Sequence, residues 1–127
     1  MKLLLDTHAL LWWLLDDAGL PASARRAIAG AEIVRVSAAS IWEIAIKQRL
    51  GKLPELAIPA AELPELARAS GFVPLAVDER HAAAVASLPP RHRDPFDHLL
   101  IVQAQIEQLT LVSRDTQFAA YGIALHW

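Results

Sequence analysis

Four acidic residues stand where their carboxylates could bind one cation, and these are Asp6, Glu43, Asp97 and Asp115. Ionised carboxylates that share a pocket repel each other, so they need either protons or a bound cation to coexist. The ligands would be oxygen atoms, because the chain has no Cys, and such a set favours Mg²⁺ or Mn²⁺. An ion of this kind can polarise a phosphate and supply a hydroxide for in-line attack. The acids therefore point to hydrolysis of a phosphodiester.

The spacing of apolar residues predicts the elements that would position these acids. Short apolar runs predict strands over residues 3–5, 33–37, 72–77, 109–113 and 123–125. Helices are expected over residues 8–15, 22–29, 39–50, 61–69, 79–88 and 96–108. This alternation predicts an α/β fold with a central, mostly parallel sheet of four to five strands and helices on both faces. Pro74 has no N–H to donate to a neighbouring strand, so the third strand is expected at a sheet edge.

The acids fall near the ends of these strands, where open parallel sheets bind ligands. Asp6 ends the first predicted strand, and Asp115 follows the fourth. Glu43 comes within about two helical turns of the second strand. Asp97 stands near the start of the helix that leads to the fourth strand. We expect all four to converge on one rim of the sheet.

Each acid also has a purely structural interpretation. Asp6 could simply cap the first helix, and Asp115 could simply form a turn. Glu43 could be a solvated partner of Lys47, one helical turn further on. Its apolar neighbours, among them Trp42, instead predict a mostly buried face that carries a single acid. The four acids together are therefore more informative than any one of them.

The segment from Asp94 to Asp97 separates a cap from a candidate ligand. Asp94 is expected to be the helix N-cap, with Pro95 at the first helical position. Asp97 is then spare, because a capping box would favour the longer Glu or Gln at its position. We expect Asp97 to act at the site, with Asp94 in a supporting role.

The composition narrows the class of protein. The 127 residues include 12 Lys and Arg against 14 Asp and Glu, a net charge of −2, and 54% are hydrophobic. Such a chain can bury a substantial core, and we expect one domain over residues 1–127. The near-neutral charge excludes a chain-wide basic surface for nonspecific nucleic-acid binding. The absence of Cys excludes disulfides, thiol catalysis and zinc fingers.

The apolar N-terminus does not have the features of a targeting segment. Asp6 and His8 interrupt it, and the uninterrupted part from Ala9 to Leu15 has only seven residues. A secretory signal needs about 7–15 apolar residues, and a membrane span needs about 20. We expect a cytoplasmic protein without membrane contact.

Four motifs in a fixed order give the chain a recognisable signature. They are Asp6-Thr7-His8-Ala9-Leu10-Leu11-Trp12, Ser37-Ala38-Ala39-Ser40-Ile41-Trp42-Glu43-Ile44, His92-Arg93-Asp94-Pro95-Phe96-Asp97 and Ser113-Arg114-Asp115. Together they resemble the PIN-domain family, and closely its VapC-type toxins, over nearly the whole chain. The resemblance implies a three-layer α/β/α nuclease fold, Mg²⁺- or Mn²⁺-dependent cleavage of RNA, and a cognate antitoxin that holds the toxin inactive.

The resemblance also implies roles for individual residues. Asp6, Glu43 and Asp97 match the three core acids of the family. Asp115 matches a fourth acid that varies more among members. The hydroxyl residues Thr7 and Ser113 match positions that support the same pocket.

Three arginines near the expected rim could contact RNA phosphates, and these are Arg91, Arg93 and Arg114. Taken singly, each could be an ordinary solvated charge. Their position beside an acidic pocket favours a track for phosphates. No aromatic-rich stacking motif indicates recognition of particular bases, so the sequence leaves the target RNA open.

The helix predicted after Asp6 is apolar around its whole circumference, so one packed side cannot hide it all. It could lie entirely inside the domain. We expect instead that Trp12 and Trp13 are partly exposed and covered by an antitoxin segment or by a second copy of the chain in a homodimer.

Other functions fit these residues less well. A receiver domain of signalling proteins would need paired acids after the first strand and a Lys after the fifth. A haloacid-dehalogenase-type phosphatase would need an Asp in place of His8. A PIN scaffold that binds without cleaving stays open as an alternative, because ligand residues alone do not demonstrate turnover.

Overall fold

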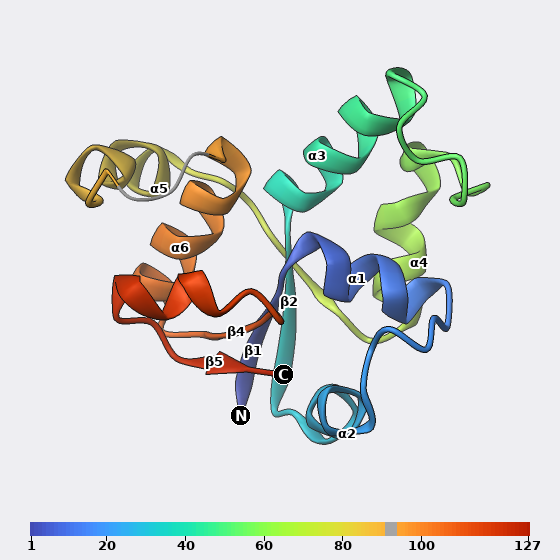
Figure 1. Ribbon diagram of the computed structural model, residues 1–127, viewed down its shortest axis with the longest axis horizontal. Helices are drawn as coiled ribbons and strands as arrows, with labels where there is room; N and C mark the ends of the chain where they lie inside the picture. The colour runs from blue at the N-terminus through green and yellow to red at the C-terminus, as the bar shows by residue number, and fades with distance from the viewer. Residues whose placement is uncertain (91–93) are drawn as a thin grey trace.

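The sheet of this protein is entirely parallel in the computed structural model, which describes residues 1–90 and 94–127. Its strands within these residues are β1 (Lys2–Leu5), β2 (Ile33–Ser37), β3 (Val73–Leu75), β4 (Thr110–Val112) and β5 (Leu125–His126). Their order across the sheet is β3-β2-β1-β4-β5 (Figure 1). The strand with Pro74 lies at an edge, as predicted, because proline cannot donate to a further neighbour.

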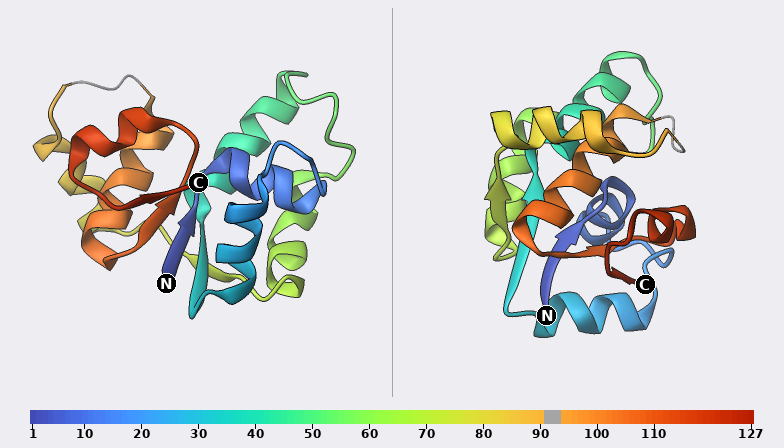
Figure 2. Two further views of the ribbon diagram at one scale, coloured as in Figure 1. Left: turned by 60° about the horizontal axis from the view of Figure 1, so that its bottom comes forward. Right: turned by 90° about the vertical axis from the view of Figure 1, so that its left-hand side faces the viewer.

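Helices cover both faces of the sheet (Figures 1 and 2). The α-helices are α1 (Thr7–Leu14), α2 (Ala22–Gly30), α3 (Ala38–Arg49), α4 (Leu63–Ala69), α5 (Glu79–Ala84) and α6 (Pro95–Glu107). Short 3₁₀ helices are η1 (Ala60–Glu62), η2 (Val85–Ser87) and η3 (Thr116–Tyr121). In the described part of the chain, none of these helices has both the length and the apolar character needed to cross a bilayer.

The central strand β1 separates two apolar clusters and so divides the molecule into three layers. Leu3 and Leu5 pack with residues of α1, α2, α3 and α4. Leu4, which points the opposite way because side chains alternate along a strand, packs with residues of α6 and η3. All three leucines are fully buried. The three-layer α/β/α prediction is confirmed.

The sequence misplaces several element ends and overlooks η3. The helix predicted over residues 61–69 divides into η1 and α4, where Pro64 occupies the first turn of α4 and has no N–H for a preceding bond. The helix predicted over 79–88 likewise ends in η2. Residues 116–121 form η3, where the sequence predicted no element, and β5 begins at Leu125, two residues later than expected.

A buried histidine joins α5 to α6. His81 is only 1% exposed, and its Nδ1 accepts the backbone N–H of Asp78 at 3.0 Å. This leaves Nε2 to carry the ring proton toward Glu107 Oε2, 3.0 Å away. The hydrogen bond from His81 is the main reason that the pKa of Glu107 lies below its usual value, with the charge of Arg80 acting in the same direction.

Candidate functional site

The order of the strands creates a switch point between β1 and β4. The chain continues from β1 to β2 and β3 on one side, whereas β4 and β5 lie on the other. Open α/β sheets bind ligands beyond the carboxyl ends of the strands at such a point. Asp6 directly follows β1, and Ser113 directly follows β4. The Asp6 N–H also donates to Val112 O at 3.1 Å, which fixes both residues at this rim.

Asp6 is both a helix cap and a buried acid. Its Oδ1 accepts the Ala9 N–H at 2.7 Å at the start of α1, and the residue is 8% exposed. Burial raises the pKa of Asp6, and the negative charge of Glu43 raises it further. The Ser113 hydroxyl, the Ala9 N–H and the nearby His8 lower it in part. A carboxylate so placed is stabilised by an adjacent positive charge.

Glu43 reaches the same rim from the second turn of α3. It is 5% exposed, and its Oε1 accepts the Thr7 hydroxyl at 2.7 Å. Its Oε2 lies 2.6 Å from Lys47 Nζ, and Ser40 Oγ is 3.1 Å from the Thr7 hydroxyl. The expected pairing with Lys47 is thus present, but Glu43 is buried rather than solvated. Thr7 connects it to the helix that Asp6 caps.

An open pocket of about 390 Å³ extends from Asp6 along the end of β4. Ser113 and Asp115 line it together with His8, Arg114, Thr116, Gln117 and Trp127. Asp115 also has the structural role that the sequence allowed, because its Oδ1 accepts the Gln117 N–H at 2.9 Å and caps η3. Its own N–H donates to Ser113 Oγ at 3.0 Å. The pocket therefore brings together Asp6, Ser113 and Asp115.

The start of α6 carries the remaining two acids. Asp94 is the N-cap, with its Oδ1 accepting the Phe96 N–H at 2.9 Å, and the predicted cap is confirmed. Asp97 is half-buried in the first turn of α6, which packs against α3. It does not line the pocket beside Asp6. Among residues 1–90 and 94–127, no three His, Asp or Glu side chains are grouped closely enough to hold a metal ion as they stand.

Aromatic side chains of α1 pack against residues distant in the sequence, and one of them also contacts Arg114. The Arg114 guanidinium lies 4.9 Å from the centre of the Trp12 ring, which also packs near Trp127 at 5.8 Å. Trp13 packs near Phe72 at 5.6 Å. Both α1 tryptophans are half-buried, which agrees with the predicted partial exposure. The predicted RNA contacts Arg91 and Arg93 lie outside the described residues.

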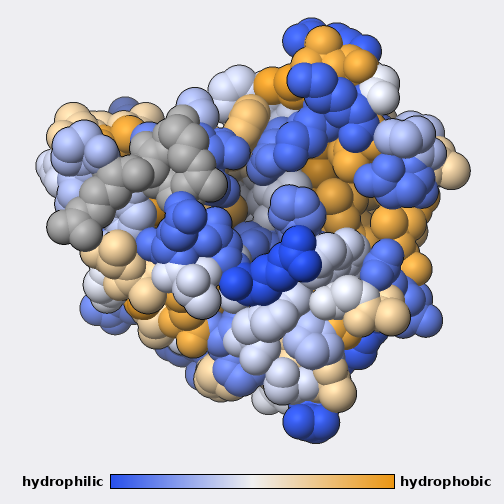
Figure 3. Space-filling view, in the orientation of Figure 1, coloured by the Kyte–Doolittle hydropathy of each residue, from blue (hydrophilic) through white to orange (hydrophobic). Residues whose placement is uncertain are grey.

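The sequence did not single out two residues that the structure adds to this region. Ser40 lies one helical turn before Glu43, so its position in the second motif was a usable signal. Trp127 lies at the C-terminus and reaches the pocket through the pairing of β5 with β4. Figure 3 shows hydrophilic side chains gathered over the centre of this face, where α1, α3 and α6 begin, and apolar surface between α3 and α4.

Known proteins are similar to this chain in sequence or in fold. The PIN domain family model matches residues 3–124. Ribonuclease VapC22 of Mycobacterium tuberculosis is 30% identical over 123 residues, which cover 93% of this chain and 90% of that protein. Ribonuclease VapC16 of the same organism is 50% identical over 50 residues, 39% of this chain and only 36% of that protein. The solved structure of VapBC2 from Rickettsia felis bound to a promoter DNA fragment has the same fold, with a TM-score of 0.69 at 13% identity over 99% of this chain and 98% of that chain.

Proposed function

Because the chain belongs to the PIN-domain family, we propose that it is the toxin of a toxin-antitoxin pair and a metal-dependent endoribonuclease that acts in the cytoplasm. The whole chain, residues 1–127, would form one PIN domain. The observation that carries the proposal is the pair of buried acids, Asp6 and Glu43, beside the switch point of a parallel sheet. The ribonuclease names of VapC22 and VapC16 support RNA as the substrate.

The donor set fits a hard divalent cation. Mg²⁺ commonly binds proteins through one or two carboxylates and keeps several waters, so two close acids are enough to begin a site. Asp6 and Glu43 would hold the ion, with Asp97 and Asp115 completing its surroundings. Burial raises the pKa of Asp6, and a cation bound at this carboxylate would favour its ionised form. When bound, Mg²⁺ or Mn²⁺ would stabilise charge on the phosphodiester and lower the pKa of a water.

The remaining residues orient these acids and contact their carboxylate oxygens. Thr7 donates to Glu43 Oε1 and so fixes the direction of the carboxylate. Lys47 balances part of its charge through Oε2. Ser113 lies beside Asp6 at the end of β4, and its hydroxyl offsets part of the rise in the pKa of Asp6. Arg114, held over the Trp12 ring at the pocket mouth, is placed to attract an RNA phosphate.

An RNA-cleavage assay tests this function. The wild-type protein should cut RNA in Mg²⁺ or Mn²⁺ and stop in EDTA, whereas Asp6→Asn should lose the activity while it keeps its circular dichroism spectrum. Equal cleavage in EDTA, or full activity of folded Asp6→Asn, would refute the mechanism. RNA binding by the wild-type protein without cleavage in either ion would favour the alternative, an inactive PIN scaffold.

An antitoxin and a second copy of the chain are the proposed protein partners. Both α1 tryptophans, Trp12 and Trp13, keep part of their surface exposed, and an amphipathic antitoxin helix could cover them. A basic side chain of the antitoxin could then lie against the acids and exclude both RNA and the cation. VapBC2 of Rickettsia felis, which has the same fold, is named as a VapBC assembly, and this is consistent with a protein partner here.

Binding measurements test the partners. Truncation of Trp12 or Trp13 to Ala should weaken the antitoxin complex by roughly 1–4 kcal/mol, the range of aromatic anchors in interfaces. Sedimentation of the wild-type protein should show a dimer. A chain that stays monomeric at high concentration, captures no small protein from its source cells and does not harm cells when expressed alone would refute the proposed partners.

A further inference from the structure

One tryptophan of the described residues is largely exposed. Trp42 on α3 is 56% exposed, although tryptophan is highly buried on average. Its ring centre lies 4.9 Å from that of Phe96 at the start of α6, with the ring planes at 77°. Rings that meet nearly at right angles share only a small part of their area. This contact therefore fixes the indole in place and leaves a broad face of it open.

Each residue of this aromatic pair directly precedes one of the proposed acids, one on α3 and the other on α6. Trp42 directly precedes Glu43, and Phe96 directly precedes Asp97. Consecutive Cα atoms are about 3.8 Å apart, so the two rings and the two carboxylates leave the backbone from adjacent positions. Glu43 turns toward Thr7, whereas Trp42 turns toward Phe96. Trp42 and Glu43 thus lie on neighbouring sides of the second turn of α3, and Phe96 and Asp97 follow each other in the first turn of α6.

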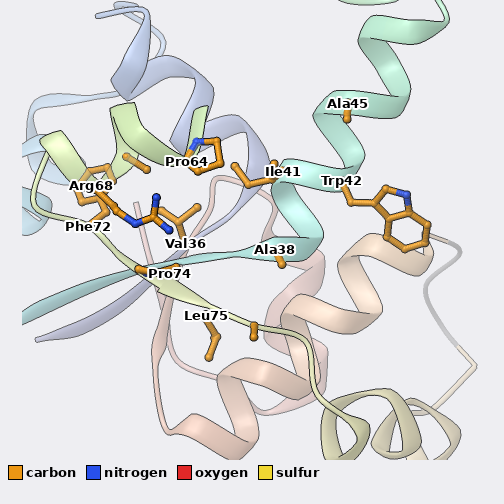
Figure 4. A pocket seen from close by; sticks show the side chains of 12 residues that line it. Val36, Ala38, Ile41, Trp42, Ala45, Pro64, Arg68, Phe72, Pro74 and Leu75 are labelled. Atoms are coloured by element: carbon orange, nitrogen blue, oxygen red, sulfur yellow. The ribbon is translucent and has the colours of Figure 1, made fainter. Parts of the chain in front are cut away.

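Trp42 lies at the edge of an apolar groove, and the other residues that line the groove lie on one side of it (Figure 4). The groove, of about 430 Å³, runs between α3, α4 and β3. Figure 4 shows the indole reaching toward the start of α6 and away from Pro64, Arg68 and Phe72 in that groove. A partner that filled the groove would contact Trp42 at its border, whereas the indole extends toward Phe96. The end of the indole that meets Phe96 lies at the start of α6, the helix turn that also carries Asp97.

We propose that Trp42, fixed by Phe96, stacks on an unpaired base of the RNA next to the bond that is cut. This inference rests on the proposed function and adds to it a residue that would hold the RNA beside the acids. Proteins commonly bind single strands by combining a phosphate site with aromatic side chains on which bases stack. A base held in a duplex has no free face for the indole. Stacking depends little on base identity, so this contact selects unpaired nucleotides more than a sequence.

A binding experiment with two matched oligomers tests the stacking. The cleavage-deficient Asp6→Asn chain is titrated in Mg²⁺ against a short fluorescein-labelled oligoadenylate and against an abasic ribose-phosphate oligomer of equal length. Adding Trp42→Ala should weaken oligoadenylate binding roughly 5- to 150-fold and leave binding of the abasic oligomer unchanged. Trp42→Tyr, which keeps a stacking ring, should retain most of the affinity. Leu50→Ala is the control, because Leu50 is 58% exposed at the far end of the same helix.

Several results would overturn the inference. Unchanged oligoadenylate binding by Trp42→Ala would do so, and so would an equal loss of binding to both oligomers, which indicates a loss of structure or charge. If Trp42→Ala instead converts a dimer into a monomer in sedimentation and binds RNA normally, the ring belongs to a protein interface. If even the parent chain does not bind oligoadenylate, the inference also fails. Cleavage of RNA by the wild-type protein decides separately whether the proposed function holds.

Discussion

Asp6→Asn should make the protein more stable near neutral pH while it abolishes RNA cleavage. The substitution removes the negative charge but keeps an Oδ1 atom to accept the Ala9 N–H. Because burial raises the pKa of Asp6, the folded state binds a proton at this carboxyl more tightly than the unfolded chain does. The resulting stabilisation is fully present below the ordinary Asp pKa of about 3.9 and is lost as the pH rises through the raised value. Wild-type protein near neutral pH therefore bears a cost that the Asn variant does not.

A second variant separates the contribution of the helix cap to stability from the contribution of the charge. Asp6→Ala removes the same charge and also the cap, whose loss costs about 1 kcal/mol. For a chain of this length, that corresponds to a midpoint roughly 2–8 °C below that of Asp6→Asn. The Ala variant should stay below the Asn variant at every pH, because the cap does not depend on the charge.

Thermal unfolding in EDTA, followed by circular dichroism, measures these differences. Asp6→Asn should melt above wild type near neutral pH, and the two should converge below about pH 4. Asp94→Asn is the matched control, since it makes the same change at the N-cap of α6 and should shift the stability by less than about 0.5 kcal/mol. An Asn variant that melts below wild type near neutral pH, or a difference that persists in acid, would refute the reasoning.

Three further predictions concern other acids and their partners. Asp97→Asn should lose RNA cleavage while Asp94→Asn keeps most of it, since Asn still caps α6; equal losses in folded variants would contradict this. Thr7→Val leaves Oε1 of the buried Glu43 carboxylate without the Thr7 hydroxyl that donates to it, and urea unfolding should show a loss of about 1.5–3 kcal/mol; an unchanged midpoint would count against the hydrogen bond. Because the pKa of Glu107 is lowered in the folded protein, its ionised carboxylate stabilises the fold above the ordinary Glu pKa of about 4.3. This stabilisation is lost as the pH falls through the folded-state pKa. Glu107→Gln should therefore narrow the stability difference between neutral and acidic pH, and an undiminished difference would argue against the His81 contact as its cause.

The fold was predictable because local signals agreed with the topology. Leu3 to Leu5 form a short apolar run ended by Asp6, which is the pattern of a strand buried on both faces, and β1 is the central strand. Pro74 indicated an edge from a single missing N–H. The errors fall where the local signal was weak, as in η3, whose 3₁₀ turns begin at the cap provided by Asp115 and end at Gly122 in a left-handed conformation.

The candidate site was predictable in its residues but not in its contacts. Strand ends alone placed Asp6 at the rim, and the structure puts Glu43 close enough to influence its pKa. The bond between Thr7 and Glu43 depends on how α1 packs on α3, which no local pattern specifies. Asp97 shows the same limit. Its place in the first turn of α6 was foreseen, whereas its distance from the other acids depends on the packing of whole helices.

Exposure of the aromatic residues was the least predictable property, and it reversed one expectation. The sequence predicted a mostly buried face around Trp42, yet its indole is 56% exposed. Trp12 and Trp13 belong to a helix with no polar side, but distant residues cover part of them, with Trp127 packing on Trp12 and Phe72 on Trp13. Periodicity records how many apolar side chains a helix carries, whereas their burial depends on which distant segments lie over them. At Trp42 the ring contact among residues 1–90 and 94–127 is the edge contact with Phe96, which leaves more than half of the tryptophan exposed.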